Sequence, residues 1–192
     1  MNLNIPYLET DNKLLNDAYR IAAGDIVGNI VYYQNGLLTE EKPCMIAGLD
    51  YNTPWTRDTA INIWNALSIL SPEVSKNTLL AVLEEEEGSI YIGGQYWDSI
   101  IWMIGAREYC RFHKDDNFYR LAFEAGRNSV HRLEEDEFDE EDGLFRGPAV
   151  YGDGIAAYPD KYSKCPNQGS GILEWVDYPG NPVYPKGYGI PM

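Results

Sequence analysis

Apolar residues repeat at helical spacing along five stretches of the chain, and this repetition constrains the fold more than any other feature. The helix that begins near Trp97 is apolar on more than one side, whereas its neighbours carry a single apolar stripe. Antiparallel helix pairs joined by short turns place one member outside and one inside. The sequence therefore predicts an all-α fold of antiparallel αα-hairpins around a common centre. The expected helix starts are Asp11, Thr56, Ser71, Trp97, and Asp115 or Asp116.

Turn-forming residues suggest where these elements end. We expect the first helix to cover residues 11–33, and the third to include residues 84–87 and end at Gly88. From about residue 143 to Met192 the chain is rich in Gly, Pro, Tyr and Asn, which predicts a long irregular C-terminal loop region. A chain of 192 residues is long enough for one substantial core, so we expect a single domain over residues 1–192.

Charge and aromatic content narrow the classes of partner. The formal net charge is −15, which argues against nucleic acid and against an anionic membrane surface, because both are bound by surplus Lys and Arg. Aromatic residues are dominated by 15 Tyr and 5 Trp. Their flat apolar faces and hydrogen-bonding edges suit neutral polar ligands such as sugars, although many aromatic residues simply pack in cores.

Metal, redox and membrane functions have little support in the sequence. Three widely spaced cysteines lack a CxxC pair, and the acidic stretch 134–143 does not match the calcium-binding loop pattern. Two histidines on separate helices do not suggest a metal pair, so we expect no cofactor. The start of the chain resembles no export signal and no apolar run could cross a bilayer, which favours the cytoplasm. The three cysteines are Cys44, Cys110 and Cys165, and the two histidines are His113 and His131.

Charged and aromatic residues stand together at the starts of two expected inner helices. Trp55, Arg57 and Asp58 open one helix, and Trp97 with Asp98 opens another. Acids in a first helical turn are favoured by the helix dipole. A carboxylate and a guanidinium hold vicinal hydroxyls, while an indole stacks on a sugar face. The pattern therefore predicts a sugar site, and the alternative is ordinary first-turn acids with Arg57 as their salt-bridge partner.

A third acid lies in the loop sequence GPAVYGDGIAAYP of residues 147–159. Asp153 stands there between two glycines, with Tyr151 and Tyr158 nearby. Desolvation by such surroundings raises a carboxyl pKa and can keep the group protonated as a general acid. A plain Gly-Asp-Gly turn without a catalytic role is the alternative.

Three segments together resemble the six-hairpin (α/α)6-toroid glycoside hydrolases, especially the glycogen-debranching and α-glucosidase-like members. The segments are PWTRDTAINIW, YWDSIIWMIGAREYCRFHKDDNFYRLAFEA and EEDGLFRGPAVYGDG, between about residues 50 and 158. The resemblance implies that Trp55, Arg57 and Asp58 bind the sugar at the scissile end, and that Trp97 and Asp98 bind the same or a neighbouring sugar. It further implies that Asp153, beside Tyr151, is the general acid.

Chain length is the main departure from that family. The family fold closes a ring of twelve helices, whereas this sequence supplies about five. Inverting hydrolysis of glucosides needs a second carboxyl as general base, and the sequence offers no candidate for it. The resemblance therefore implies the N-terminal portion of the enzyme, incomplete as a catalyst, which self-associates or joins a missing C-terminal half through exposed apolar surface.

Other functions remain open from the sequence. A non-catalytic carbohydrate-binding or vestigial module would use the same Trp, Arg and Asp residues without an acid at Asp153. A sugar epimerase on a related toroid usually works through cavity histidines, and a glycoside phosphorylase needs a phosphate-binding set. A helical scaffold that binds no sugar is the remaining alternative.

Overall fold

The structure is a computed structural model that describes residues 5–48, 51–94, 98–141 and 143–145. The chain divides into two compact units, Met1–Val130 and His131–Met192. The expectation of a single domain over residues 1–192 stays a prediction.

Helices dominate the described residues, as the sequence predicts, and short β-hairpins connect or flank them. The helices are α1 (Lys13–Gly28), α2 (Thr56–Asn62), the π-helical η1 (Ile63–Leu67), α3 (Ser68–Leu70), α4 (Pro72–Ala81), α5 (Asp98–Phe112) and α6 (Asp116–Glu137). The strands are β1 (Ile30–Tyr33), β2 (Lys42–Met45), β3 (Leu83–Glu86), β4 (Ser89–Ile92), β5 (Phe138–Asp139) and β6 (Leu144–Phe145). Consecutive strands pair as antiparallel hairpins. Because α2, η1 and α3 follow one another without a break, we call them helix α2–α3.

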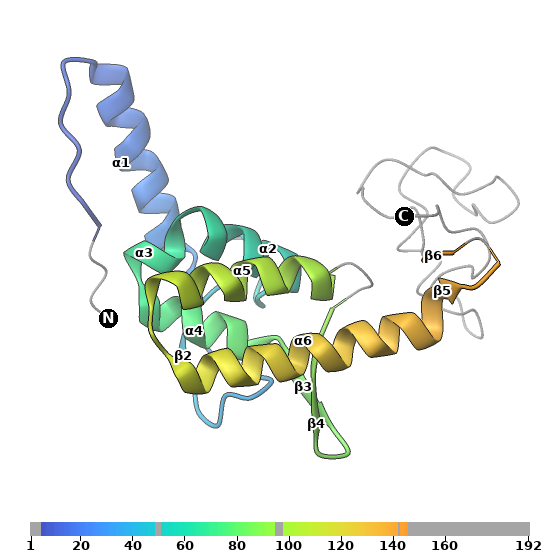
Figure 1. Cartoon of the computed structure of the whole chain (residues 1–192). Coiled ribbons are helices and arrows are strands. Elements are labelled where there is room, and N and C mark those ends of the chain that lie inside the picture. Colours follow the sequence, from blue (N-terminus) through green and yellow to red (C-terminus); the bar gives the residue numbers. More distant parts are fainter. Residues whose placement is uncertain (1–4, 49–50, 95–97, 142, 146–192) are drawn as a thin grey trace, which may run out of the picture. The chain divides into compact units, whose positions relative to one another are not determined.

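Antiparallel αα-hairpins form the main body of the first unit (Figure 1). Helix α2–α3 turns into α4 at Ser71, whose hydroxyl accepts a backbone hydrogen bond while Pro72 occupies the first helical position. Helix α5 turns into α6 at Asp115, whose carboxylate accepts a hydrogen bond of 3.0 Å from Phe118 N. Both starts confirm capping residues that the sequence predicts.

Helices α2–α3 and α5 lie side by side and run in the same direction. Near the middle of the contact, a methyl group on Gly105 would lie 2.7 Å from Ala60 Cα, so the two backbones touch. Farther along, His113 Nε2 lies 2.6 Å from the carbonyl oxygen of Ser68. Both partners advance by eight residues between the two contacts, from 60 to 68 and from 105 to 113. The two helices therefore begin at the same end of the unit.

Aromatic rings fill the core between the hairpins. Trp102 of α5 is fully buried, and its indole N–H donates to the carbonyl of Leu79 in α4 at 3.3 Å. Phe118 of α6 packs against Trp102 with ring centroids 6.5 Å apart, and against Tyr109 at 5.0 Å. These contacts anchor α4 and α6 to α5.

The β3–β4 hairpin takes the place of the last part of the expected third helix, so that part of the prediction is wrong. The helix ends at Ala81 rather than at Gly88, and residues 84–86 belong to strand β3. Glu87 and Gly88, at φ values of 51° and 80°, form the two-residue turn. Strand β4 is held by α6, because Ile92 N donates to Ser129 Oγ at 2.9 Å. This partner lies far along the chain, so local periodicity does not reveal it.

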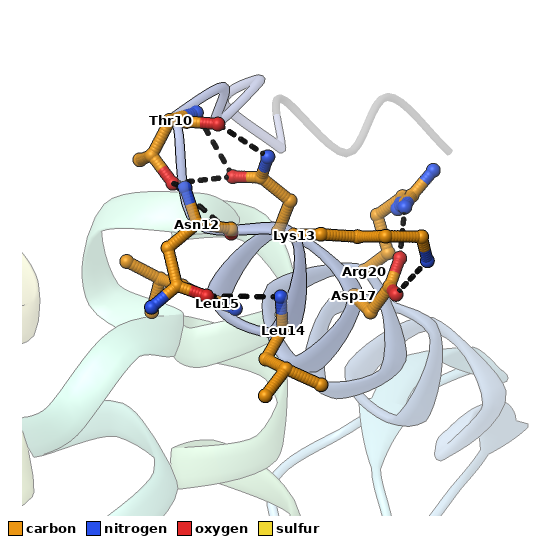
Figure 2. A network of polar contacts seen from close by, with 8 residues as sticks. Thr10, Asn12, Lys13, Leu14, Leu15, Asp17 and Arg20 are labelled. Atoms are coloured by element: carbon orange, nitrogen blue, oxygen red, sulfur yellow. Dashed lines mark hydrogen bonds and ion pairs between the residues drawn. The ribbon is translucent and has the colours of Figure 1, made fainter.

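The first helix also ends earlier than expected. Helix α1 stops at Gly28, and residues 30–33 of the predicted helix form β1, which pairs with β2. The Ile-Val-Tyr-Tyr sequence of β1 consists of β-branched and aromatic residues, which favour strands. Asn12 rather than Asp11 caps the helix, because its side chain accepts from Leu14 N at 3.0 Å (Figure 2). Asn16 bonds back to Thr10 and fixes the preceding turn.

Large apolar side chains are exposed on two helices of the first unit. Every residue of α1 is at least partly exposed, including Leu14 and Ile21. On helix α2–α3, Ile61, Trp64 and Ile69 are exposed. Apolar surface of this kind is what the sequence leads us to expect from inner helices that have further neighbours. Self-association through it stays a prediction.

The described part of the second unit contains the end of α6 and a short hairpin. Strands β5 and β6 pair Phe138 with Phe145, and the ring centroids lie 5.1 Å apart. Glu141 N donates to Asp139 Oδ1 at 2.9 Å within the turn. The acidic stretch 134–141 therefore forms a helix end and a turn, as expected for solvated acids.

The close approach of α2 and α5 predicts opposite effects of adding a methyl group to two helical glycines. Gly105→Ala should lower the free energy of unfolding by about 1–3 kcal/mol, because its methyl group meets the Ala60 backbone. Gly24→Ala in α1 meets open space and should raise it by about 0.5–1 kcal/mol through helix propensity. Urea unfolding of both variants checks this, and a stabilising Gly105→Ala would contradict the packing.

Candidate functional site

The predicted site residues come together where α2 and α5 begin. Trp55 precedes α2 in an extended conformation, and Arg57 and Asp58 occupy its first turn. Asp98 opens α5. Because the two helices are parallel neighbours, their first turns meet, and Arg57 Nε lies 3.6 Å from Asp98 Oδ1. The structure thus brings residues of the two sequence motifs into contact across 41 positions of the chain, from 57 to 98.

Burial makes this ion pair, the Arg57/Asp98 pair, unlike those on the surface. The Asp98 side chain is 7% exposed, whereas the Arg57 side chain is 32% exposed. A carboxylate so far from water needs compensation, which the guanidinium and the N-terminal end of the α5 dipole provide. Both residues make further contacts. Part of the Arg57 side chain remains exposed at the surface.

Two aromatic residues, Tyr51 and Trp55, precede Arg57 in the chain. Trp55 is 42% exposed, and Tyr51 meets it edge to face with centroids 5.8 Å apart and planes at 70°. Tyr33 of β1 holds Thr53, two residues before Trp55, because its hydroxyl lies 2.8 Å from Thr53 Oγ1. Sequence reasoning overlooks Tyr51, although it lies only four positions before Trp55. The exposed indole offers a flat apolar surface, and it belongs to the residue that precedes the first turn of α2.

Thr56 supports the site in a way that the sequence does not predict. We expected its hydroxyl to cap α2, but Trp55 occupies the cap position and Thr56 is the first helical residue. The Thr56 hydroxyl instead donates to the carbonyl of Gly93 at 2.8 Å. This hydrogen bond joins the start of α2 to the segment that leads from β4 toward α5.

Asp58 is partly buried in the first turn of α2. The other predicted site residues, Trp97, Tyr151 and Asp153, lie outside the described residues. The described part of the site therefore consists of Trp55, Arg57, Asp58 and Asp98.

Several shifted pKa values belong to groups away from this site. Burial raises the pKa of the Cys44 thiol to about 12 and also raises that of Cys110, and both cysteines are free. A hydrogen bond from Lys76 lowers the pKa of Asp115 at the start of α6. Cys44 and Cys110 are therefore protonated thiols at neutral pH, as the sequence suggests.

The described residues offer neither a metal-binding cluster nor a membrane-spanning helix. Among the residues that the structure describes, no cluster of three or more His, Cys, Asp or Glu side chains could hold a metal ion. No helix in the described ranges is both long enough and apolar enough to span a bilayer.

Comparisons with known proteins leave the function to be inferred from the site itself. No protein-family model matches the chain. No curated protein and no solved structure shows significant similarity to it.

The burial of Asp98 predicts a stability effect that an exposed pair lacks. Asp98→Asn should lower the free energy of unfolding by about 2 kcal/mol, because it removes the countercharge of a partly buried guanidinium. Asp17 of α1 pairs with Lys13 and Arg20 at the surface, so Asp17→Asn should cause no measurable change. Equal effects of the two variants in urea unfolding would contradict this assignment.

Proposed function

We propose that this chain is the N-terminal part of a six-hairpin toroid glycoside hydrolase, and that the shared start of α2 and α5 grips a neutral sugar. The observation that carries the proposal is the meeting of Arg57 and Asp98 at the starts of two parallel helices, with the exposed Trp55 at the cap position of α2. Parallel inner helices with outer helices returning between them are the repeating unit of such a ring. The contacts of Ala60 with Gly105 and of Ser68 with His113 support this repeat.

The chemistry of the site fits a hydroxylated ring. Stacking on Trp55 would desolvate the apolar face of a pyranose, while Arg57 would donate hydrogen bonds and Asp58 would accept them from ring hydroxyls. Asp98 would act mainly by orienting the guanidinium of Arg57, because its own side chain is almost fully buried. The net charge of −15 disfavours anionic ligands.

Hydrolysis on this proposal follows the inverting route. Asp153 would protonate the leaving glycosidic oxygen, and a second carboxylate about 6.5–9.5 Å away would activate water on the opposite face of the sugar. The substrates would be oligo- or polysaccharide glucosides, in the cytoplasm, without a cofactor. The second carboxylate would come from the missing C-terminal half.

An epimerase is a weaker proposal, because such enzymes depend on cavity histidines. The ring of His113 is bonded to the Ser68 carbonyl at 2.6 Å and packs on Tyr109 with centroids 4.9 Å apart. These contacts lie at the first residue of α3 and just after the end of α5, away from Arg57 in the first turn of α2.

Sugar binding is tested by replacing, one at a time, two exposed tryptophans: Trp55 before α2 and Trp64 within helix α2–α3. Calorimetric titration with maltotriose should show binding to the wild-type chain, and Trp55→Ala should weaken it at least about tenfold, or about 1.4 kcal/mol. Trp64 is 53% exposed in η1, nine residues after Trp55, so Trp64→Ala serves as control and should bind normally. The proposal fails if the wild-type chain binds no neutral glucoside, or if both variants bind equally.

A second experiment separates catalysis from binding by substitution of Asp153. In the full-length or complemented protein, Asp153→Asn should lower hydrolysis of an aryl α-glucoside at least about 100-fold while maltotriose affinity stays unchanged, because a general acid contributes to the rate but not to ground-state binding. Progress of hydrolysis is followed by release of the aryl group. Unchanged hydrolysis would remove Asp153 from this role. Sugar binding without release of the aryl group by the full-length or complemented wild-type protein would favour the carbohydrate-binding module.

A further inference from the structure

A short relay of hydrogen bonds ties the start of α2 to the end of α4. Gly93 N donates to the carbonyl of Val82 at 2.9 Å, and the Thr56 hydroxyl donates to the carbonyl of Gly93 at 2.8 Å. Val82 directly follows α4, and Gly93 directly follows β4. Thr56 itself is 5% exposed, so its hydrogen bond is shielded from water. The relay fixes the first turn of α2, where Arg57 is the next residue.

Gly94 lies against both Thr56 of α2 and Asp98 of α5. Its φ of +112° lies in a region that residues with a side chain rarely adopt. A methyl group there would lie 2.9 Å from Asp98 Oδ2 and 2.8 Å from Thr56 Oγ1. The backbone of Gly94 therefore fits between the hydroxyl of Thr56 and the carboxylate of Asp98, and a side chain would displace one of them.

Gly93 is required for a different reason. A methyl group on Gly93 would lie 2.8 Å from the carbonyl oxygen of Val82 and 2.5 Å from Glu84 Oε1. The Glu84 side chain could move, but the Val82 carbonyl belongs to the relay. Each glycine of the pair thus gives room to a different neighbour, and only Gly94 lies against Asp98.

We infer that Thr56 and Gly94 are positioning residues that set the geometry of the Arg57/Asp98 pair. Neither residue is a sugar ligand on this account. Thr56 holds the helical turn that carries Arg57, and Gly94 leaves the Asp98 carboxylate the space it needs to face the guanidinium. The consequence for sugar affinity rests on the proposed function, whereas the geometry of the pair does not.

The test uses variants that separate the geometry from ordinary stability. Thr56→Val keeps the shape and loses the hydroxyl, Thr56→Ser keeps the hydroxyl, and Gly94→Ala adds the methyl group. Gly88→Ala controls for positive φ, since Gly88 has a φ of +80° and a methyl group there meets open space. Thr59→Val controls for loss of a buried hydroxyl, since Thr59 Oγ1 has no hydrogen-bond partner among the described residues.

The first readout is the Nε–Hε resonance of Arg57 in a ¹⁵N correlation spectrum, assigned by its absence in Arg57→Lys. Thr56→Val and Gly94→Ala should shift this resonance, while Thr56→Ser and both controls should leave it in place. The inference is overturned if Thr56→Val and Gly94→Ala fold and keep the wild-type resonance. Thr56→Val alone decides the case if Gly94→Ala does not fold, because valine is isosteric with threonine.

The second readout is maltotriose affinity, which a merely structural role would not change in a folded variant. Thr56→Val and Gly94→Ala should bind at least about tenfold more weakly, and Thr56→Ser should restore the wild-type value. Shifted resonances in a protein whose wild type binds no sugar would uphold the positioning role and refute the proposed function. Wild-type affinity in both variants would refute the role in sugar binding and leave the proposed function standing.

Discussion

The contact between Ala60 and Gly105 is the constraint on which the rest of the structure depends. A glycine at position 105 lets the backbones of α2 and α5 touch, and this contact fixes the two helices as parallel neighbours. Parallel neighbours begin at the same end, so their first turns meet. Arg57 and Asp98 then pair without any direct link between them in the sequence. Helix α4 returns the chain toward the start of α2, and the β3–β4 hairpin begins and ends there, because Gly93 N bonds to the carbonyl of Val82.

The starts of α2 and α5 lie together and combine the positive ends of two helix dipoles. The positive ends of both helix dipoles meet where Asp58 and Asp98 lie, and Arg57 places a full positive charge beside Asp98. Trp55 and Tyr51, which precede α2, add a pair of packed aromatic rings. A site that combines balanced charge with an exposed indole favours neutral hydroxylated ligands over strongly charged ones. The proposed sugar specificity follows from this combination.

Local chemistry made parts of the structure predictable from the sequence. The Ser71-Pro72-Glu73 start of α4 and the Asp115 cap of α6 depend on neighbouring residues, and both were predicted correctly. The common end of the two inner helices was also predicted, because each of the two motifs opens a helix.

Features that depend on remote partners were missed. The β3–β4 hairpin relies on Ser129 of α6, and the Thr56 hydroxyl bonds to Gly93 instead of capping its own helix. Tyr51 was overlooked because nothing local distinguishes it from the other 14 tyrosines. The role of Asp153 stays a prediction, since this residue lies outside the described ranges.

A crystal structure of the chain grown with maltotriose is the most direct test of the central claim. The account predicts a glucose ring stacked on the indole of Trp55, with a hydroxyl within hydrogen-bond distance of the Arg57 guanidinium and with α2 and α5 parallel. A sugar ordered only elsewhere on the protein, or helices α2 and α5 that begin at opposite ends, would contradict it.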